Sequence, residues 1–151
     1  MIAAADQLEQ DFGVAADVWS CPSFTELSRD GIATERWNML HPTEARRLGF
    51  AERSLAGRPE GPVVAATDYM RAYAEQIRPF LPRRYRVLGT DGFGRSDYRR
   101  ALRRHFEVDR HHVVLAALTE LAADDTVPAS TAADAIARYG IDPGKPEPAR
   151  A

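Results

Sequence analysis

A glycine-rich loop at residues 89–97 is the first place where this sequence could bind a charged ligand. Its three glycines precede a predicted helix, and glycine lets backbone N–H groups approach a phosphate at a helix start. The spacing differs from G-x-G-x-x-G, however, and no P-loop lysine follows. A tight turn is the simpler interpretation, but the other side chains of the loop favour a surface that contacts a partner. These side chains are Asp91, Phe93, Arg95 and Asp97.

The four histidines and the one cysteine form no recognisable metal or catalytic motif. The histidine spacing does not match that of metal ligands, and a single cysteine cannot build a structural zinc site. His105 lies in the apolar stripe of a predicted helix, which is typical of a hydrogen-bonded core histidine. His41 follows Trp37 and Asn38 and is a more interesting candidate, but no partner for a nucleophilic triad is visible.

Four arginines share the polar face of the helix predicted over residues 96–106. Like charges four residues apart destabilise an isolated helix by up to about 0.5 kcal/mol per pair, so we expect acidic groups or solvent near this face. Nucleic acid is a poor candidate because the chain carries 20 basic and 22 acidic side chains, a formal net charge of -2. The four residues are Arg99, Arg100, Arg103 and Arg104.

The composition is that of one globular domain. The chain has 151 residues, of which 44% are hydrophobic and 28% are charged, so it is long enough for a single core. The longest apolar runs, such as Val113 to Leu118, are far shorter than the roughly 20 residues of a membrane-spanning helix. A lone Cys21 cannot form an intramolecular disulfide, which favours a reducing, cytoplasmic setting.

Hydrophobic patterning predicts an α/β fold with an open, mostly parallel sheet flanked by helices. The residues 62–67 are apolar on both faces, as a strand buried between two layers of helices requires. Residues 1–142 are predicted to form the domain, and residues 143–151 a proline-rich tail without a core of its own. The expected strands are residues 14–19, 62–67 and 85–89. The expected helices are residues 3–12, a stretch that begins at 24 and stops at 30–31 before a second turn around 37–40, and residues 68–77, 96–106, 110–123 and 131–139.

Glycines and helix-capping residues set the expected boundaries of these elements. Gly13 and Gly140 suit left-handed helix ends, and Asp30-Gly31 predicts a stop within residues 24–40. We expect one helical turn in the connection of residues 43–61, and an inner stripe of Tyr69, Tyr73 and Ile77 in the following helix. The expected helix N-caps are Ser23, Asp68, Ser96, Asp109 and Thr131, with Glu26 and Asp134 completing capping boxes.

Several long blocks of the sequence resemble one protein family. They include SFTELSRDG at residues 23–31, ERWNMLHP at 35–42, VLGTDGFGRSD at 87–97 and HFEVD at 105–109, with shorter blocks at 67–70 and 74–79. Together they resemble the carboxyl-terminal domain of bacterial homodimeric pyruvate dehydrogenase (acetyl-transferring). This family is the thiamine-dependent, pyruvate-decarboxylating component of the pyruvate dehydrogenase complex. The resemblance runs from about Gln7 to Pro148 and implies a transketolase-like carboxyl-terminal domain.

The resemblance also implies that the cofactor site lies elsewhere in the enzyme. In this family two earlier domains bind thiamine diphosphate and magnesium, through a Gly-Asp-Gly motif and paired asparagines farther along the chain. This sequence has Thr90-Asp91-Gly92 in place of that triplet and a single asparagine, Asn38. We therefore expect no cofactor to be bound by this chain on its own, and no decarboxylation of pyruvate by it.

A further implication concerns the start of the chain. In the family a buried strand precedes the helix that opens this sequence, so we expect the sheet to lack its first strand. Losing about five residues of central strand would forfeit on the order of 5 to 8 kcal/mol, against the 5 to 15 kcal/mol of a typical domain. The isolated chain is then expected to be marginally stable, with a sheet edge prone to association.

The leading hypothesis is an architectural module of the decarboxylating enzyme. Its expected partners are the remaining domains of that enzyme, the homodimer mate and, through it, the dihydrolipoyl acetyltransferase core, with no nucleic acid and no membrane. The alternatives are a freestanding domain that binds a small or regulatory ligand between residues 20–23 and 89–94, and a non-functional gene remnant. The residues expected to order a subunit or domain contact are Trp37, Asn38, His41, Asp91, Phe93, Arg95 and Asp97.

Overall fold

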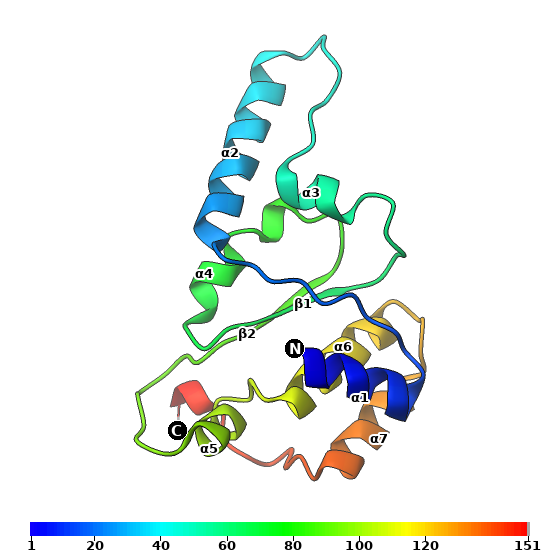
Figure 1. Cartoon of the computed structure of the whole chain (residues 1–151), viewed down its shortest axis with the longest axis vertical. Coiled ribbons are helices and arrows are strands. Elements are labelled where there is room, and N and C mark those ends of the chain that lie inside the picture. Colours follow the sequence, from blue (N-terminus) through cyan, green and yellow to red (C-terminus); the bar gives the residue numbers. More distant parts are fainter. Residues whose placement is uncertain (151) are drawn as a thin grey trace.

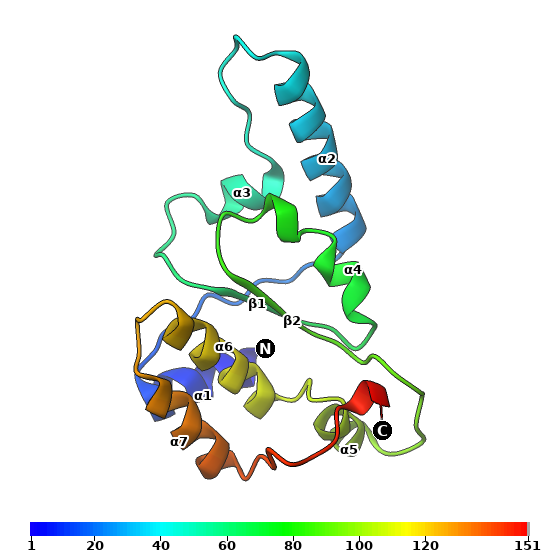
Figure 2. The same ribbon diagram turned by 180° about the vertical axis from the view of Figure 1, so that it is seen from behind.

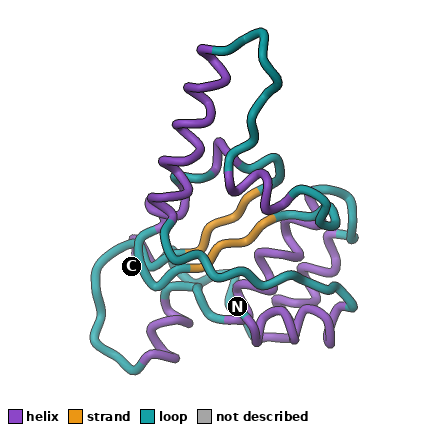
Figure 3. The backbone as a smooth tube through the Cα atoms, turned by 45° about the horizontal axis from the view of Figure 1, so that its top comes forward, coloured by secondary structure: helices purple, strands orange, loops and turns teal. Residues whose placement is uncertain are grey.

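A two-stranded parallel sheet lies between two layers of helices in the computed structural model, which describes residues 1–150 (Figure 1). Strand β1 (Val63–Ala66) pairs with strand β2 (Tyr85–Leu88), with Val63 opposite Tyr85 and Ala66 opposite Leu88. The expected parallel α/β architecture is confirmed. The strands run through the middle of the molecule, and helix α2 projects away from them (Figure 3).

Side chains alternate across the two strands and feed two separate core clusters. Val64, Ala66 and Leu88 pack on the cluster around Leu118, which includes α1 (Ile2–Phe12) and α6 (Arg110–Ala123). Val63 and Ala65 join Tyr85 and Val87 in the second cluster, on the side of α2 (Phe24–Leu40) and α4 (Arg71–Glu75). The two-faced apolar character of residues 62–67 therefore reflects burial on both sides.

The first helical layer joins the two ends of the domain. Helix α7 (Ala129–Tyr139) packs on α6, and Asp11 at the end of α1 contacts α7 through Arg138 at 2.7 Å and the Tyr139 hydroxyl at 2.8 Å. Several end signals are confirmed: Gly13 and Gly140 have φ of 68° and 58°, and Asp109 accepts from the His112 N–H at 3.0 Å. The Asp11 contacts therefore hold the end of α1 against α7.

The second layer contains one unbroken helix where a stop is expected. The hydroxyl of Ser23 accepts from the Glu26 N–H at 3.2 Å, and α2 continues from there to Leu40 without ending at Asp30-Gly31. The Gly31 backbone lies against Phe80, so that a Cβ there would be 2.3 Å from the ring. Gly31 is needed for close packing, and the predicted helix stop is wrong.

The strand expected at residues 14–19 is also wrong. These residues form no strand. The Val14 N–H donates to the Leu8 carbonyl, but the backbone groups of residues 15–22 form no hydrogen bond with the backbone of any other described residue. A strand needs a neighbour to satisfy its backbone groups, and the described sheet contains only β1 and β2. Residues 14–19 therefore have the apolar pattern of a strand but no hydrogen bonds to a neighbouring strand, and Val18 and Trp19 are 44% and 51% exposed.

The helix after β1 is shorter than expected and starts differently. Asp68 caps no helix; it pairs with Arg103 at 2.7 Å, and α4 begins at Arg71 after Met70. Of the predicted stripe, Ile77 is buried, whereas Tyr69 and Tyr73 are exposed and contact each other. Because α4 has only five residues, it presents Ala74 to the core and leaves the tyrosines outside.

Two further cap predictions are wrong because each helix starts at a neighbouring position. Helix α5 (Arg99–His105) begins after Tyr98 rather than at Ser96, and α7 begins after Pro128, ahead of Thr131 and Asp134. Neither helix has a side-chain cap. The connection of residues 43–61 does contain a short helix, α3 (Phe50–Leu55), as expected. The single-turn η1 (Arg78–Phe80) lies between α4 and β2.

The last residues fold back over the carboxyl end of the sheet, where η2 (Pro148–Arg150) lies near α5 (Figure 2). The Lys145 ammonium donates to the main-chain carbonyls of Arg104 and His105 and pairs with Glu107 at 3.1 Å. These contacts tie residues 143–150 to the end of α5. Within residues 1–150, no helix has the length and apolar character needed to cross a bilayer.

Candidate functional site

The tip of the projecting α2 arm is built around Trp37. The His41 ring stacks on the Trp37 ring at 4.2 Å between centroids, and the Arg47 guanidinium lies 3.4 Å from the same ring centre. His41 Nδ1 is 2.8 Å from the Trp37 carbonyl oxygen, which turns the imidazole back onto its own helix. His41 therefore helps to order the arm, and among the described residues no nucleophile or carboxylate contacts its ring.

Asn38 closes the same arm. Its side chain donates to the Arg47 carbonyl at 2.9 Å and accepts from the Arg47 N–H at 2.8 Å. The amide therefore replaces the two backbone partners that a strand would offer to Arg47. Farther down the arm, Asp30 accepts a hydrogen bond from the Phe50 N–H, so that contacts at two places hold the return segment against α2.

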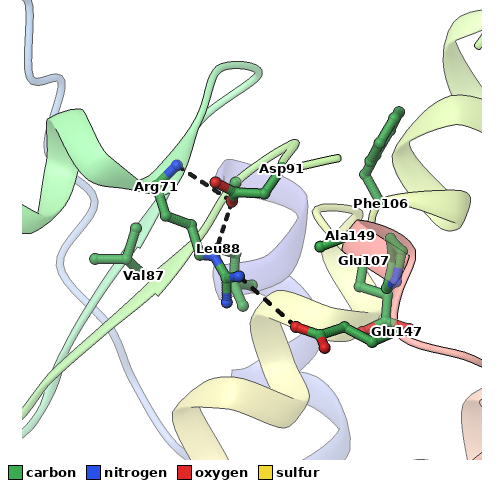
Figure 4. A pocket seen from close by; sticks show the side chains of 10 residues that line it. Arg71, Val87, Leu88, Asp91, Phe106, Glu107, Glu147 and Ala149 are labelled. Atoms are coloured by element: carbon green, nitrogen blue, oxygen red, sulfur yellow. Dashed lines mark hydrogen bonds and ion pairs between the residues drawn. The ribbon is translucent and has the colours of Figure 1, made fainter. Parts of the chain in front are cut away.

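A crevice of about 120 Å³ lies at the carboxyl end of β2 (Figure 4). Asp91 accepts from Arg71 Nε at 2.8 Å and from the Arg71 backbone N–H at 3.3 Å, and Arg71 lies 3.9 Å from Glu147 of the tail. Gly92 has a φ of 109°, and a Cβ atom on this residue would lie 2.9 Å from the Ala149 Cα. The missing side chain of Gly92 therefore leaves room for the tail to pack against the loop, and the loop does not form a phosphate-binding turn.

The seven candidate contact residues divide into two groups. Trp37, Asn38 and His41 lie at the tip of the α2 arm, whereas the loop after β2 extends from the opposite end of the molecule (Figure 1). Within the loop, Asp91 points into the crevice and Phe93 is 83% exposed. The Asp97 carboxylate accepts from the Tyr98 N–H at 2.7 Å. The structure therefore provides two separate surfaces, and no site unites the seven residues.

His105 differs from its expected state. Its Nε2 is buried without a hydrogen-bond partner among the described residues, so the prediction of a hydrogen-bonded core histidine is wrong. Burial, with the nearby positive charges of Arg95 and Lys145, lowers the pKa of this imidazole below its usual value. The ring packs edge-on against Phe106 at 4.8 Å, an apolar contact that suits the neutral form.

The arginine face of α5 finds an acidic partner at only one of its four positions. Arg103 forms two hydrogen bonds with Asp68, and these hydrogen bonds lower the pKa of the Asp68 carboxyl. Arg104 donates to the Gly140 carbonyl at 2.9 Å. Among the described residues, Arg99 and Arg100 have no carboxylate within ion-pair distance, and both side chains are exposed.

Comparison with known proteins gives this geometry its context. The family model of the transketolase-like TK C-terminal domain matches residues 1–109. The chain belongs to this family. Three curated proteins that are similar to it are each named pyruvate dehydrogenase E1 component, from Cupriavidus necator, Pseudomonas aeruginosa and Escherichia coli (strain K12).

The similarity to these E1 components is high and covers nearly the whole chain. Identity is 58% over 148 residues for the first, 59% over 146 for the second and 53% over 146 for the third. The matches cover 98%, 96% and 96% of this chain but 16% of each relative. The resemblance to bacterial pyruvate dehydrogenase is thereby confirmed, and this transketolase-like C-terminal domain spans about a sixth of the length of its curated relatives.

The crevice at the carboxyl end of β2 does not fit thiamine diphosphate or its magnesium ion. No group of three histidine, cysteine or acidic side chains within residues 1–150 is placed to hold a metal ion. The crevice of about 120 Å³ is also smaller than the 300 to 1,000 Å³ of typical cofactor pockets, and three carboxylates face it against one arginine. The lining carboxylates are Asp91, Glu107 and Glu147.

Sequence reasoning missed the side chains that complete the crevice. Arg71 follows β1 by five residues, and its position beyond the carboxyl end of a parallel strand could have marked it. Glu147 gave no signal, because a proline-rich tail has no periodicity that would reveal its docking. The expected partners of residues 89–94, at residues 20–23, do not line the crevice.

Proposed function

We propose that this domain is an architectural module of a pyruvate dehydrogenase E1 component and works only together with the remainder of that enzyme. The observation that carries the proposal is the 58% identity over 98% of the chain to a protein of that name. In the assembled enzyme, thiamine diphosphate and magnesium are bound by other domains. The whole enzyme oxidatively decarboxylates pyruvate in the cytoplasm and passes the acetyl group to lipoyl groups.

An unsatisfied sheet edge supports a role within a larger assembly. In a parallel pair the N–H and C=O of one residue point to the same side, and the Val63 and Thr67 N–H groups face β2. Val64 and Ala66 therefore direct their backbone groups away from β2, toward a side where the described residues form no further strand. Residues 15–20 also make no backbone hydrogen bond in this structure. A neighbouring polypeptide would satisfy both.

Exposed apolar side chains support the same role. Ile32, Met39 and Leu40 on the α2 arm are 57%, 70% and 52% exposed, and Phe93 on the opposite loop is 83% exposed. We take these side chains as candidate contact residues, since large exposed apolar patches mark interfaces in soluble proteins. We assign Trp37, Asn38 and His41 to one contact, with a neighbouring domain or the homodimer mate, and Asp91, Phe93, Arg95 and Asp97 to a second. The acetyltransferase core is reached through the assembled dimer.

Complementation tests the proposal. The 151-residue chain is mixed at increasing ratios with an E1 component that lacks this region, in the presence of thiamine diphosphate and magnesium, and pyruvate turnover is measured. We expect turnover to recover in the mixture and to be absent with either part on its own. A Phe93→Ala, Met39→Ala variant, altered at both proposed contacts, should require a higher ratio, whereas Arg150→Ala should behave as the unmodified chain. Failure to recover at any ratio would contradict the proposal.

Calorimetry distinguishes the ligand-binding alternative. A freestanding regulatory domain would bind phosphorylated metabolites or nucleotides saturably as a monomer. The small, largely acidic crevice at the carboxyl end of β2 disfavours such anions. We therefore expect no saturable binding of these compounds at this crevice, and a micromolar dissociation constant for binding of any of them there would favour the alternative.

A further inference from the structure

A groove of about 430 Å³ runs along the free edge of β2, on the side away from β1. One wall comes from α4 and η1, which contribute Arg71, Glu75 and Arg78. The other comes from Glu120 of α6, with Arg84 and Arg86 beside it. We call this the β2-edge groove. It is distinct from the crevice at the carboxyl end of β2, although Arg71 and Val87 border both.

The floor of the β2-edge groove is unpaired strand backbone. The carbonyls of Arg84 and Leu88 accept from β1, so the intervening residues Tyr85 and Val87 direct their N–H and C=O groups into the groove. Arg78 Nη1 donates to the Tyr85 carbonyl at 2.6 Å. Among the described residues, the two N–H groups and the Val87 carbonyl have no partner. An extended chain laid along β2 would satisfy them.

The charges of the groove favour an acidic occupant. Its four arginine side chains are 45% to 50% exposed, whereas the Glu120 side chain is 6% exposed and lies under Arg84 and Arg86 at 3.0 Å and 2.6 Å. Burial would raise the pKa of the Glu120 carboxyl, but the hydrogen bonds from Arg86 and Arg84 outweigh it and lower that pKa. Glu75 is held by two hydrogen bonds from Arg78. Arg84 also pairs with Asp124 at 3.4 Å, and Arg71 pairs with Asp91 at 2.8 Å. Four guanidinium groups therefore line the groove itself against two carboxylates, and both of these carboxylates are engaged.

We propose that the β2-edge groove binds an extended acidic peptide of a partner protein, which adds to β2 as a further strand. A second copy of this chain is disfavoured as the occupant, because a twofold contact along β2 would bring Arg84 and Arg86 close to the same residues of the other copy. The backbone supplies general affinity for an extended chain, and the arginines select for acidic side chains.

The alternation of β2 sets the pattern that the peptide must have. Arg84 and Arg86 lie on the α6 face of the strand, and the buried Tyr85 and Val87 side chains lie on the α4 face. Side chains of the added strand on the α6 face would therefore lie beside two guanidinium groups. Four residues span about 13 Å, so a segment of four to five residues with an acidic side chain at every second position fits.

Fluorescence anisotropy with the full 151-residue chain tests this proposal. The probe is a labelled octapeptide that alternates glutamate and valine, compared with one that alternates lysine and valine and with a glutamate–valine peptide N-methylated at alternate amides. We expect saturable binding of the first only. The triple variant Arg84→Gln, Arg86→Gln, Glu120→Gln leaves no unpaired buried carboxylate, and it should raise the dissociation constant about tenfold, as the loss of two partly exposed ion pairs implies.

A charge-matched control separates the groove from net charge. The variant Arg99→Gln, Arg100→Gln, Glu9→Gln makes the same net change on other surfaces and should bind the peptide as the unmodified chain does. Hydrogen exchange should show the Tyr85 and Val87 amides protected about tenfold by the peptide. Equal binding of the N-methylated or lysine peptide, unchanged affinity of the groove variant, or self-association that the groove variant abolishes would each overturn the proposal.

Discussion

The side chain of Asn38 forms two hydrogen bonds with the backbone of Arg47, donating to its carbonyl at 2.9 Å and accepting from its N–H at 2.8 Å. These bonds join the end of α2 to the segment that returns toward the sheet. The Arg47 guanidinium then covers the Trp37 ring, 3.4 Å from its centre. Asn38 thus fixes the backbone position of Arg47, whose side chain packs on Trp37 at the tip of the arm.

Replacing Asn38 should therefore loosen the arm. Asn38→Ala removes both hydrogen bonds, and at about 1 kcal/mol each we expect the free energy of unfolding to fall by about 1 to 2 kcal/mol. Asn38→Asp keeps the acceptor for the Arg47 N–H and should lose about half as much. Urea denaturation measures both, and hydrogen exchange should show faster exchange of the Arg47 amide in the alanine variant. Equal stability of Asn38→Ala and the unmodified chain would contradict the assigned role.

Gly31→Ala should destabilise the chain although alanine is the better helix former. Alanine gains about 1 kcal/mol of helix propensity, but its Cβ would lie 2.3 Å from Phe80, and overpacking of this kind costs about 1 to 3 kcal/mol. In a Phe80→Ala background the clash is gone, so the same substitution should stabilise. Gly94→Ala, where no atom lies within 4 Å, serves as the control and should change stability by less than about 0.5 kcal/mol. Urea midpoints for the four variants would show whether the sign reverses.

Asp109 makes stability depend on pH at the acidic end. Burial opposes ionisation, but the hydrogen bonds from His112 dominate and lower the pKa of Asp109 from 3.8 to about 2. A carboxyl whose folded pKa is lowered stabilises the fold above its unfolded pKa and loses that effect as pH falls toward the folded pKa. The contribution is on the order of 2 kcal/mol above about pH 4.

Asp109→Asn isolates this contribution, because asparagine retains the capping oxygen but does not ionise. The unfolding free energies of the unmodified chain and the variant should differ most near pH 5 and converge as pH approaches 2. Urea denaturation across this range measures the difference. A difference that stays constant with pH would show that the Asp109 charge is not involved.

Lys145 should control the docking of the last residues. Its ammonium donates to the Arg104 and His105 carbonyls at the carboxyl end of α5, where a positive charge is favoured, and it pairs with Glu107. Lys145→Met should lower the unfolding free energy by about 1 kcal/mol and increase hydrogen exchange in residues 143–150. Arg150→Met removes only an exposed pair and should leave both quantities unchanged within about 0.5 kcal/mol. The reverse order of effects would contradict this assignment.

Much of the fold could be predicted because the signals are local. The two-faced apolar run of β1, the left-handed ends at Gly13 and Gly140, and the caps at Ser23 and Asp109 each depend on a few neighbouring residues. The candidate site was less accessible to prediction. Trp37, Asn38 and His41 do cooperate at one place, but the Asp91 to Asp97 loop lies at the other end of the molecule.

The sequence by itself determined the family, the layer order of an α/β fold and most helix positions, since periodicity and capping act within one or two turns. Only the tertiary structure decided which segments have partners. Residues 14–19 have strand character but no strand beside them, Gly31 lies within a continuous helix with Phe80 packed where a side chain would stand, and Glu120 is buried where Arg84 and Arg86 reach it. Each of these outcomes depends on groups that are distant in sequence, where pairing and burial are settled by packing.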